Sequence, residues 1–128
     1  MTVFQLKVVK LKNDFDKISG ATVKDLKAAL YQEAETIMTA SKRDYVPIKT
    51  GALRNSGTVY LPEEMPDRVQ VRLGFGGASA PYAAIVHEYP KSYGQGKNKY
   101  LSIPLGISAK NMASRIAEKM KRAARSRR

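Results

Sequence analysis

Apolar residues recur every three or four positions between about Thr22 and Tyr45, and most charged residues, Glu33 among them, fall off this stripe. The spacing predicts an amphipathic helix of about six turns with one buried face. Thr22, followed three residues later by Asp25, fits a helix N-cap. Pro47 disfavours helical backbone at the residue before it, so the helix is expected to end at about Tyr45.

Strands are predicted on both sides of this helix. From Arg68 to Phe75 apolar residues occupy the odd positions and polar residues or Gly74 the even ones, as in a strand with one face on the core. Residues 53–61 contain β-branched residues and are predicted as its antiparallel partner. Residues 3–11 also alternate, with a slip after Val8 that indicates a bulge.

The remaining pattern is more broken. We expect a loop at 62–66 between two prolines, and a short helix from Pro81 to just before Pro90. A short strand is expected at 100–103, and a closing helix at about 107–125. Its apolar stripe would comprise Ala109, Met112, Ala113, Ile116, Ala117 and Met120. The glycine-containing segments 76–80 and 91–99 are predicted to be flexible loops.

These elements predict an α+β fold with an antiparallel sheet of about three to five strands. One long N-terminal helix packs on the sheet, and a basic helix follows at the C-terminus. A chain of 128 residues suits a single domain spanning 1–128. The hydrophobic share of 43% supports a packed core and argues against a disordered chain.

Positive charge is concentrated at the C-terminal end. The net charge is +12, and residues 110–128 contribute +7 of it through eight basic residues and one acid. Such a cluster attracts phosphate or an acidic protein surface, although a solvated helix end that complements the helix dipole is the simpler interpretation. The candidates to face DNA or an acidic surface are Arg115, Lys119, Lys121, Arg122, Arg125, Arg127 and Arg128.

Candidate chemistry is sparse. The chain has no cysteine and one histidine, His87, and no second histidine follows the His87-Glu88 pair at zinc-helix spacing. A lone histidine beside a glutamate is most often a structural hydrogen-bonding residue. We therefore expect no cofactor, no metal and no enzymatic activity. Lysines interrupt the apolar runs near the N-terminus, so we expect a cytosolic product without a membrane span.

Three sequence blocks together resemble one family. The first is Pro47-x-x-Thr50-Gly51-Ala52-Leu53-Arg54-x-Ser56, the second is Tyr82-Ala83 with His87-Glu88, and the third is Leu101-Ser-Ile-Pro-Leu105 before a last helix. In this order they are similar to the neck or tail-completion proteins (minor capsid, head-tail connector) of long-tailed bacteriophages. The Glu88-Tyr89-Pro90 ending departs from the Glu-x-Gly-Thr turn of many relatives.

The resemblance implies a structural virion protein that is made in the host cytoplasm and assembles at the neck. It would form a ring, with six copies expected, at the connector-tail junction around the DNA passage. Its partners would be other neck proteins, the tail terminator or tube, and genomic DNA in the channel. The alternatives are a small basic nucleic-acid-binding protein that uses its C-terminal helix and, third, a small hydrolase that depends on His87.

Two further sets of residues are assigned from these arguments. The structural motif would comprise Pro47, Thr50, Gly51, Leu53, Tyr82, His87 and Glu88. A positive φ is expected at Gly51, in the Thr50-Gly51 turn. Candidate contacts to neighbouring subunits or partners lie in the first block and in the two loops: Arg54, Asn55, Gly76, Gly77, Tyr89, Tyr93, Lys97 and Lys99.

Overall fold

The computed structural model describes residues 3–12 (backbone only), 20–46, 51–66, 68–77, 80, 82–83, 87 and 99–127. Helix α1 (Val23–Ala40) continues as a π-helical turn, η2 (Ser41–Tyr45). Asp25 N donates to Thr22 Oγ1 at 3.2 Å, and Thr22 N donates to Asp25 Oδ2 at 2.9 Å, so the predicted N-cap is a complete capping box. The backbone becomes extended at Val46, which confirms the predicted end of the helix.

The sheet is built around strand β4 (Arg68–Gly76). On one side β4 pairs antiparallel with β1 (Val3–Lys12). The register shifts between Phe4 and Lys7, so the irregularity of β1 lies before Lys7 and not after Val8, where the alternation had placed it. On the other side it pairs antiparallel with β2 (Thr58–Val59) and β3 (Glu63–Glu64). The expected loop at 62–66 therefore contains a short strand, and the α+β fold with an antiparallel sheet is confirmed.

The predicted strand at 53–61 is wrong in its first half. Residues Ala52–Asn55 form a helical turn, α2, and only Thr58–Val59 form a strand. Gly51 has φ 85°, as expected for this turn. The left-handed glycine starts a new helical turn in which Asn55 N donates to Gly51 O at 2.9 Å. This local hydrogen bonding outweighs the strand preference of the residues that follow.

The prediction for the C-terminal third also needs correction. Residues Ser102–Ala109 form helix α4, where a strand was expected at 100–103. Pro104 is compatible with this helix because it lies in the first turn, where backbone N–H groups have no partner within the helix. The closing helix is not continuous from 107, because Asn111 adopts φ 62° and α5 begins after it (Met112–Ser126).

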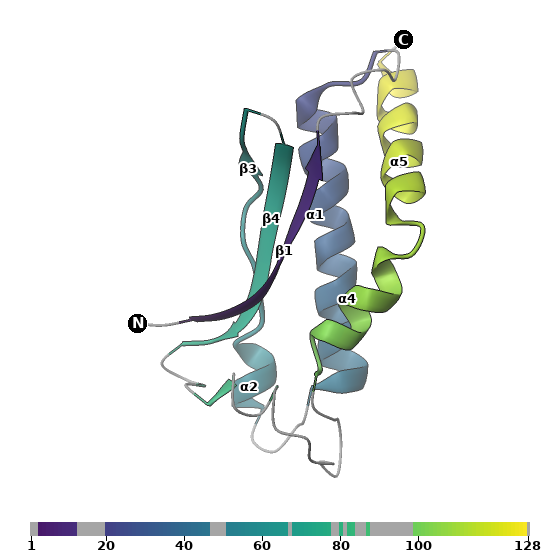
Figure 1. The fold of residues 1–128 in the computed structure, drawn as a ribbon. Coiled ribbons are helices and arrows are strands. Elements are labelled where there is room, and N and C mark those ends of the chain that lie inside the picture. Colours follow the sequence, from purple (N-terminus) through teal and green to yellow (C-terminus); the bar gives the residue numbers. More distant parts are fainter. Residues whose placement is uncertain are drawn as a thin grey trace.

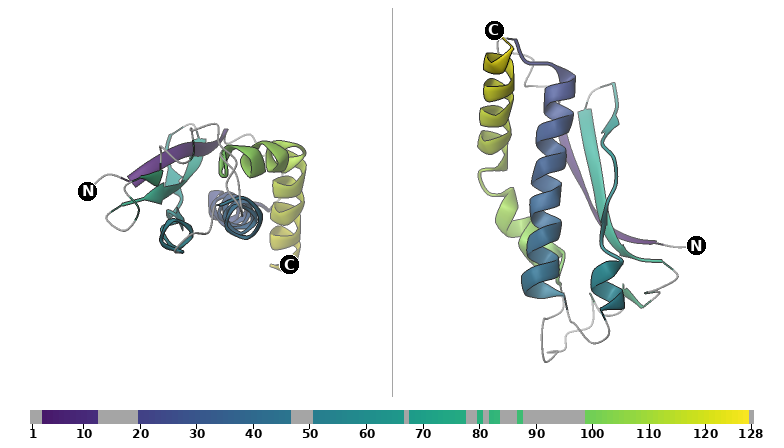
Figure 2. Two further views of the ribbon diagram at one scale, coloured as in Figure 1. Left: turned by 90° about the horizontal axis from the view of Figure 1, so that it is seen from below. Right: turned by 180° about the vertical axis from the view of Figure 1, so that it is seen from behind.

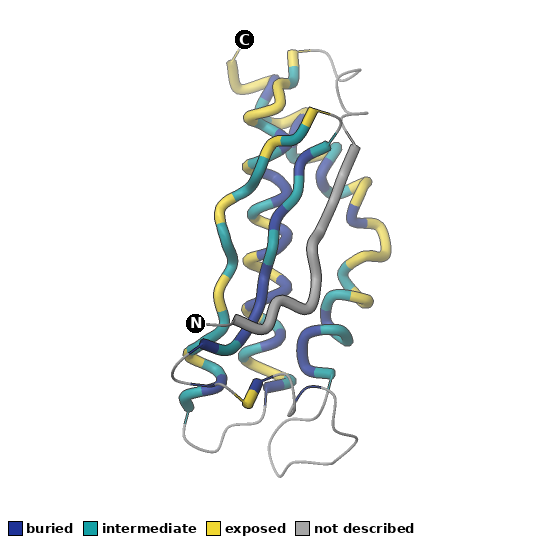
Figure 3. The backbone as a smooth tube through the Cα atoms, turned by 60° about the vertical axis from the view of Figure 1, so that its left-hand side comes forward, coloured by how far each residue is buried: buried dark blue, intermediate teal, exposed yellow. Residues whose placement is uncertain are grey.

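The elements form three layers, with the sheet on one side, α1 in the middle and α5 on the far side of α1, while α4 runs alongside α1 toward α5 (Figures 1 and 2). The apolar residues of β4 that were predicted to face the core are all fully buried (Val69, Val71, Leu73 and Phe75). Figure 3 shows buried backbone along β4 and α1, with exposed positions along β3 and α5. The side of the sheet away from α1 carries no helix among the described residues.

Helix α5 packs against α1 through four buried residues spaced four apart. They are Met112, Ile116, Met120 and Ala124, which confirms the core of the predicted stripe, whereas Ala109 and Ala113 are exposed. The predicted helix after Pro81 lies mostly outside the described residues, although Ala83 and His87 have helical backbone. None of the described helices has the length and apolar character needed to cross a membrane.

Candidate functional site

The Thr-Gly-Ala-Leu-Arg-x-Ser block forms a joint between α1 and the sheet. Leu53 is buried with an exposed fraction of 5%. The Ser56 hydroxyl donates to Leu53 O at 2.6 Å and accepts a hydrogen bond from Gly76 N at 3.0 Å. Ser56 thus links the helical turn α2 to the last residue of β4. Pro47 and Thr50 lie outside the described residues.

Arg54 and Asn55, the candidate contact residues of this block, lie on α2 rather than at the start of a strand. Arg54 is half-buried and Asn55 is exposed. Within the described part of the chain, Arg54 forms no ion pair with a carboxylate. Both residues are therefore placed where a neighbouring molecule can reach them.

The second and third blocks meet around Tyr100. This side chain is fully buried, and its hydroxyl donates to Ala83 O at 2.6 Å. Its ring contacts the rings of His87 and Phe75 edge-to-face, each with centroids 4.9 Å apart. The Ser41 hydroxyl of η2 donates to Tyr100 O at 2.7 Å. Tyr100 therefore anchors this segment inside the molecule.

His87 is fully buried and has a structural role, as expected. Lys99 N donates to His87 O at 2.8 Å, and His87 Nε2 lies 3.4 Å from the backbone nitrogen of Ser102, at the start of α4. The structure thus connects the second block to the third. Tyr82 is exposed on this segment, whereas Glu88 lies outside the described residues.

The candidate contact residues of the two predicted loops are only partly described. Gly76 and Gly77 have φ values of 126° and 91°, which favour glycine, and they form the exit from β4. Lys99 is held through its backbone at His87, as above. Tyr89, Tyr93 and Lys97 lie outside the described residues.

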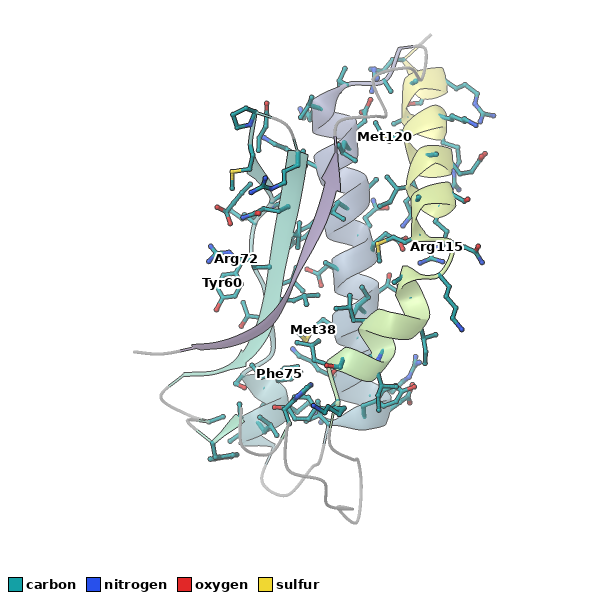
Figure 4. All side chains as sticks on the ribbon, in the orientation of Figure 1. Met38, Tyr60, Arg72, Phe75, Arg115 and Met120 are labelled. Carbon is teal, nitrogen blue, oxygen red and sulfur yellow. The ribbon has the colours of Figure 1, made fainter. Side chains whose placement is uncertain are left out.

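The basic C-terminal helix does not present all its charges outward. Arg115 Nε donates to Glu33 Oε1 at 2.9 Å, and Lys119 Nζ donates to Glu33 Oε2. Arg115 also donates to the backbone oxygens of Lys110 and Ser108. Arg115 and Lys119 are thus internal contacts, which corrects their assignment to a DNA-facing or partner-facing surface. Figure 4 shows Arg115 where α4 and α5 join.

Glu33 is the residue of this cluster that sequence reasoning missed. It was placed off the apolar stripe of α1, yet its exposed fraction is only 4%. Burial raises the pKa of Glu33, but the hydrogen bonds from Arg115 and Lys119 outweigh it, so its pKa lies below the usual value. The spacing was the available signal for this burial, since Glu33 lies three residues after Leu30 and four before Ile37 and so shares their face of the helix. A carboxylate buried on that face needs a cationic partner.

A second contact connects the end of α5 to the start of α1. Arg127 Nη1 and Nη2 donate to the two carboxylate oxygens of Asp25 at 2.9 and 2.7 Å, and Nη2 also donates to Gly20 O. The hydrogen bond from Arg127, together with those from Thr22, lowers the pKa of Asp25 from 3.8 to about 2, although burial opposes this. Arg127 is therefore also engaged within the molecule.

Three candidate basic residues remain on the outer surface of α5. Lys121, Arg122 and Arg125 are all exposed. Arg125 lies 3.5 Å from Glu118, and both side chains are more than half exposed. Lys121 and Arg122 form no ion pair or side-chain hydrogen bond within the described part of the chain. Arg128 lies outside the described residues.

An open pocket of about 530 Å³ lies between α1, η2 and α4. Its walls are mainly apolar, and Ile107 beside it has an exposed fraction of 59%. Glu33 and Arg115 line it but are bonded to each other, and Asp44, which also lines it, is bonded to Arg43. The pocket therefore offers an apolar surface and no unsatisfied charge.

On the side of the sheet away from α1, the described residues include polar side chains that contact one another. Arg72 Nε lies 2.9 Å from Glu63 Oε1, and the Arg72 guanidinium stacks over the Tyr60 ring at 5.5 Å from its centroid. Figure 4 shows Tyr60 and Arg72 together on the side of β4 away from α1. Leu61, next to Tyr60, has an exposed fraction of 78%. The described part of this face thus carries an aromatic ring and an arginine.

Comparison with known proteins adds no relative: no family model, no curated protein and no solved structure matches this chain.

Proposed function

We propose that this protein is a structural component of a bacteriophage neck, located in the virion, that assembles as a ring at the junction of connector and tail. In this proposal about six copies surround the DNA passage, and the ring contacts other neck proteins and the tail terminator or tube. The protein performs no catalysis and needs no cofactor.

One observation carries the proposal: the described residues of the three sequence blocks lie in a single connected unit. Ser56 of the first block is bonded to Gly76, which follows Phe75, and Phe75 contacts Tyr100. Tyr100 is bonded to Ala83 of the second block and immediately precedes the third. Gly76, Phe75 and Tyr100 thus connect the blocks into a scaffold, which supports a protein that acts through assembly.

The surfaces left outside this scaffold suit contacts between subunits. The open face of the sheet carries Tyr60 and Arg72, residue types that are enriched at protein interfaces. β1 forms an edge of the sheet within the described residues, and such an edge can pair with a neighbouring chain. Head-to-tail contact between two different surfaces of a subunit generates a closed ring when the rotation closes.

Imaging of the virion that contains this chain tests the proposal. The expected result is a ring of density between capsid and tail into which the three-layer fold fits, with β4 and α1 in adjacent layers. Substitution of Tyr60→Ala with Arg72→Ala should lower the melting temperature of the isolated subunit only slightly, because the Arg72–Glu63 ion pair is partly exposed, and should reduce ring formation. A virion map without this fold between capsid and tail would contradict the proposal.

A matched control is available on another face of the same subunit. Gln32 and Glu35 are exposed on α1, so Gln32→Ala with Glu35→Ala should leave ring formation unchanged if the sheet face is the contact. Equal loss of ring formation in both double variants would show that the sheet face has no special role.

A further inference from the structure

The two sides of α5 have different chemistry. The inner side consists of the four buried residues that pack against α1. Beside it, Arg115 and Arg127 are bonded to carboxylates of α1. On the outer side, Lys121, Arg122 and Arg125 lie within about one and a half turns, which we name the basic ridge. Glu118 is the one acidic residue of α5, so the ridge keeps an excess of positive charge.

The composition of this outer side favours nucleic acid over protein as its partner. The exposed residues of α5 include no apolar side chain larger than that of alanine. Protein interfaces derive most of their affinity from buried aromatic, arginine and aliphatic anchors, and charged residues are depleted at their centres. Interfaces with DNA are polar and strongly positive. The large apolar residues of α5 all point toward α1, as Met120 does in Figure 4.

We infer that the basic ridge, Lys121, Arg122 and Arg125, binds the phosphate backbone of duplex DNA without sequence preference, whereas Arg115, Lys119 and Arg127 hold α5 in place. The inference depends on α5 alone and stands whether the protein acts as a ring subunit or as a free molecule. Three phosphate contacts give a slope of log K against log salt of about −2.7 from the ridge itself.

The chain contains a matched control for this inference. Lys121-Arg122 in α5 and Lys42-Arg43 in η2 are identical pairs of residues at distant places in the fold. Replacing either pair by glutamine removes the same charge. α5 leads to the C-terminus, whereas η2 continues from the end of α1 that lies away from the C-terminus (Figure 1).

The experiment measures binding of the full chain to a labelled duplex of about 30 base pairs by fluorescence anisotropy, at salt concentrations from about 50 to 200 mM. For K121Q/R122Q we expect binding about tenfold weaker at the lowest salt, and a slope smaller in magnitude by about 2. K42Q/R43Q should bind nearly as the unchanged chain does. A thermal melt of each variant confirms that the fold is retained.

Three outcomes would overturn the inference. The first is equal weakening by both double variants, which would mean that net charge alone attracts DNA. The second is the absence of binding by the unchanged chain at the lowest salt. The third is tighter binding of polyglutamate than of duplex at the same salt, which would identify an acidic protein surface as the partner. None of these results tests ring formation, so the proposed function is judged separately.

Discussion

Helix α1 is held on its two sides by different forces. Toward the sheet, Met38 lies beside Phe75 and Gly57, and the β4 residues that face it are apolar and fully buried. Toward α5, apolar packing is supplemented by two carboxylates of α1, Glu33 and Asp25, that bind three basic side chains. The same helix therefore joins a layer held by burial to a layer held partly by charge.

This difference predicts which layer determines the stability of the fold and which layer responds to pH and salt. Burial of an aromatic or aliphatic side chain contributes about 1.5 to 3 kcal/mol, and salt weakens it little. An exposed ion pair contributes less and is screened by salt. We therefore expect the α1–sheet layer to set the global stability, and the attachment of α5 to respond to pH and to ionic strength.

The largest effect is expected on the sheet side. Phe75→Ala should destabilise the protein by about 3 to 5 kcal/mol, because it leaves a cavity beside Met38 and Tyr100. Chemical denaturation measures the change. Leu61→Ala serves as the control, since Leu61 is mostly exposed, and should stay within about 0.5 kcal/mol. Equal effects of the two substitutions would contradict the assignment of the core.

Glu33→Gln tests the α5 side and should cost about 2 to 3 kcal/mol, less than for a fully buried pair because Arg115 and Lys119 are partly exposed. Amide hydrogen exchange should increase more in α5 than in β4, because α5 loses its main polar contact. Glu35→Gln makes the same change on an exposed position of α1 and should alter neither region. Faster exchange spread evenly over both regions would remove the distinction between the two layers.

Gly57→Ala probes how tightly the sheet side is packed. A Cβ at this position would lie 2.7 Å from Phe75 Cε1 and 2.8 Å from Met38 Sδ, so the substitution should cost about 1 to 2 kcal/mol. Gly106→Ala meets no atom within 4 Å in α4 and should stabilise the protein by about 0.5 to 1 kcal/mol. Thermal melts compare the pair, and a harmless Gly57→Ala would indicate looser packing.

The smallest effect concerns Arg127→Gln, which removes the contact to Asp25 but keeps the capping box. The folded-state pKa of Asp25, about 2, lies below its ordinary value of 3.8, so the contact stabilises the fold above about pH 4. This contribution is lost as pH falls through about 2. The melting temperatures of the variant and the unchanged chain should therefore differ more at neutral pH than near pH 2, where the loss of the hydrogen bond to Gly20 O still contributes. A difference that is unaffected by low pH would exclude Asp25 as the partner.

Several parts of the fold followed from local patterns. The capping box at Thr22, the end of the long helix before Pro47 and the alternation in β4 depend on residues a few positions apart, and each was predicted correctly. The positive φ of Gly51 was also expected, because the Thr-Gly turn favours it. Predictions failed where strand preference competed with a short helix, at Ala52–Asn55 and at Ser102–Ala109.

The candidate site was less predictable, since its contacts connect distant parts of the chain. From the sequence, seven basic residues were all predicted to face DNA or an acidic surface. Nothing in their spacing indicates that Arg115 and Lys119 bind Glu33, more than 80 positions away. Likewise, Asp25 was expected to cap α1, and its contact with Arg127 depends on how α5 docks. Ser56 was part of a motif, yet only the structure connects it to Gly76.

The sequence by itself therefore determined the type of fold, the long helix, the central strand and the concentration of positive charge at the C-terminus. These properties depend on periodicity, capping and composition, which are written in neighbouring residues. Only the tertiary structure decided which of the basic residues are internal and which face outward. That division depends on the positions of two carboxylates on α1 relative to α5, and such positions are fixed only when the layers pack.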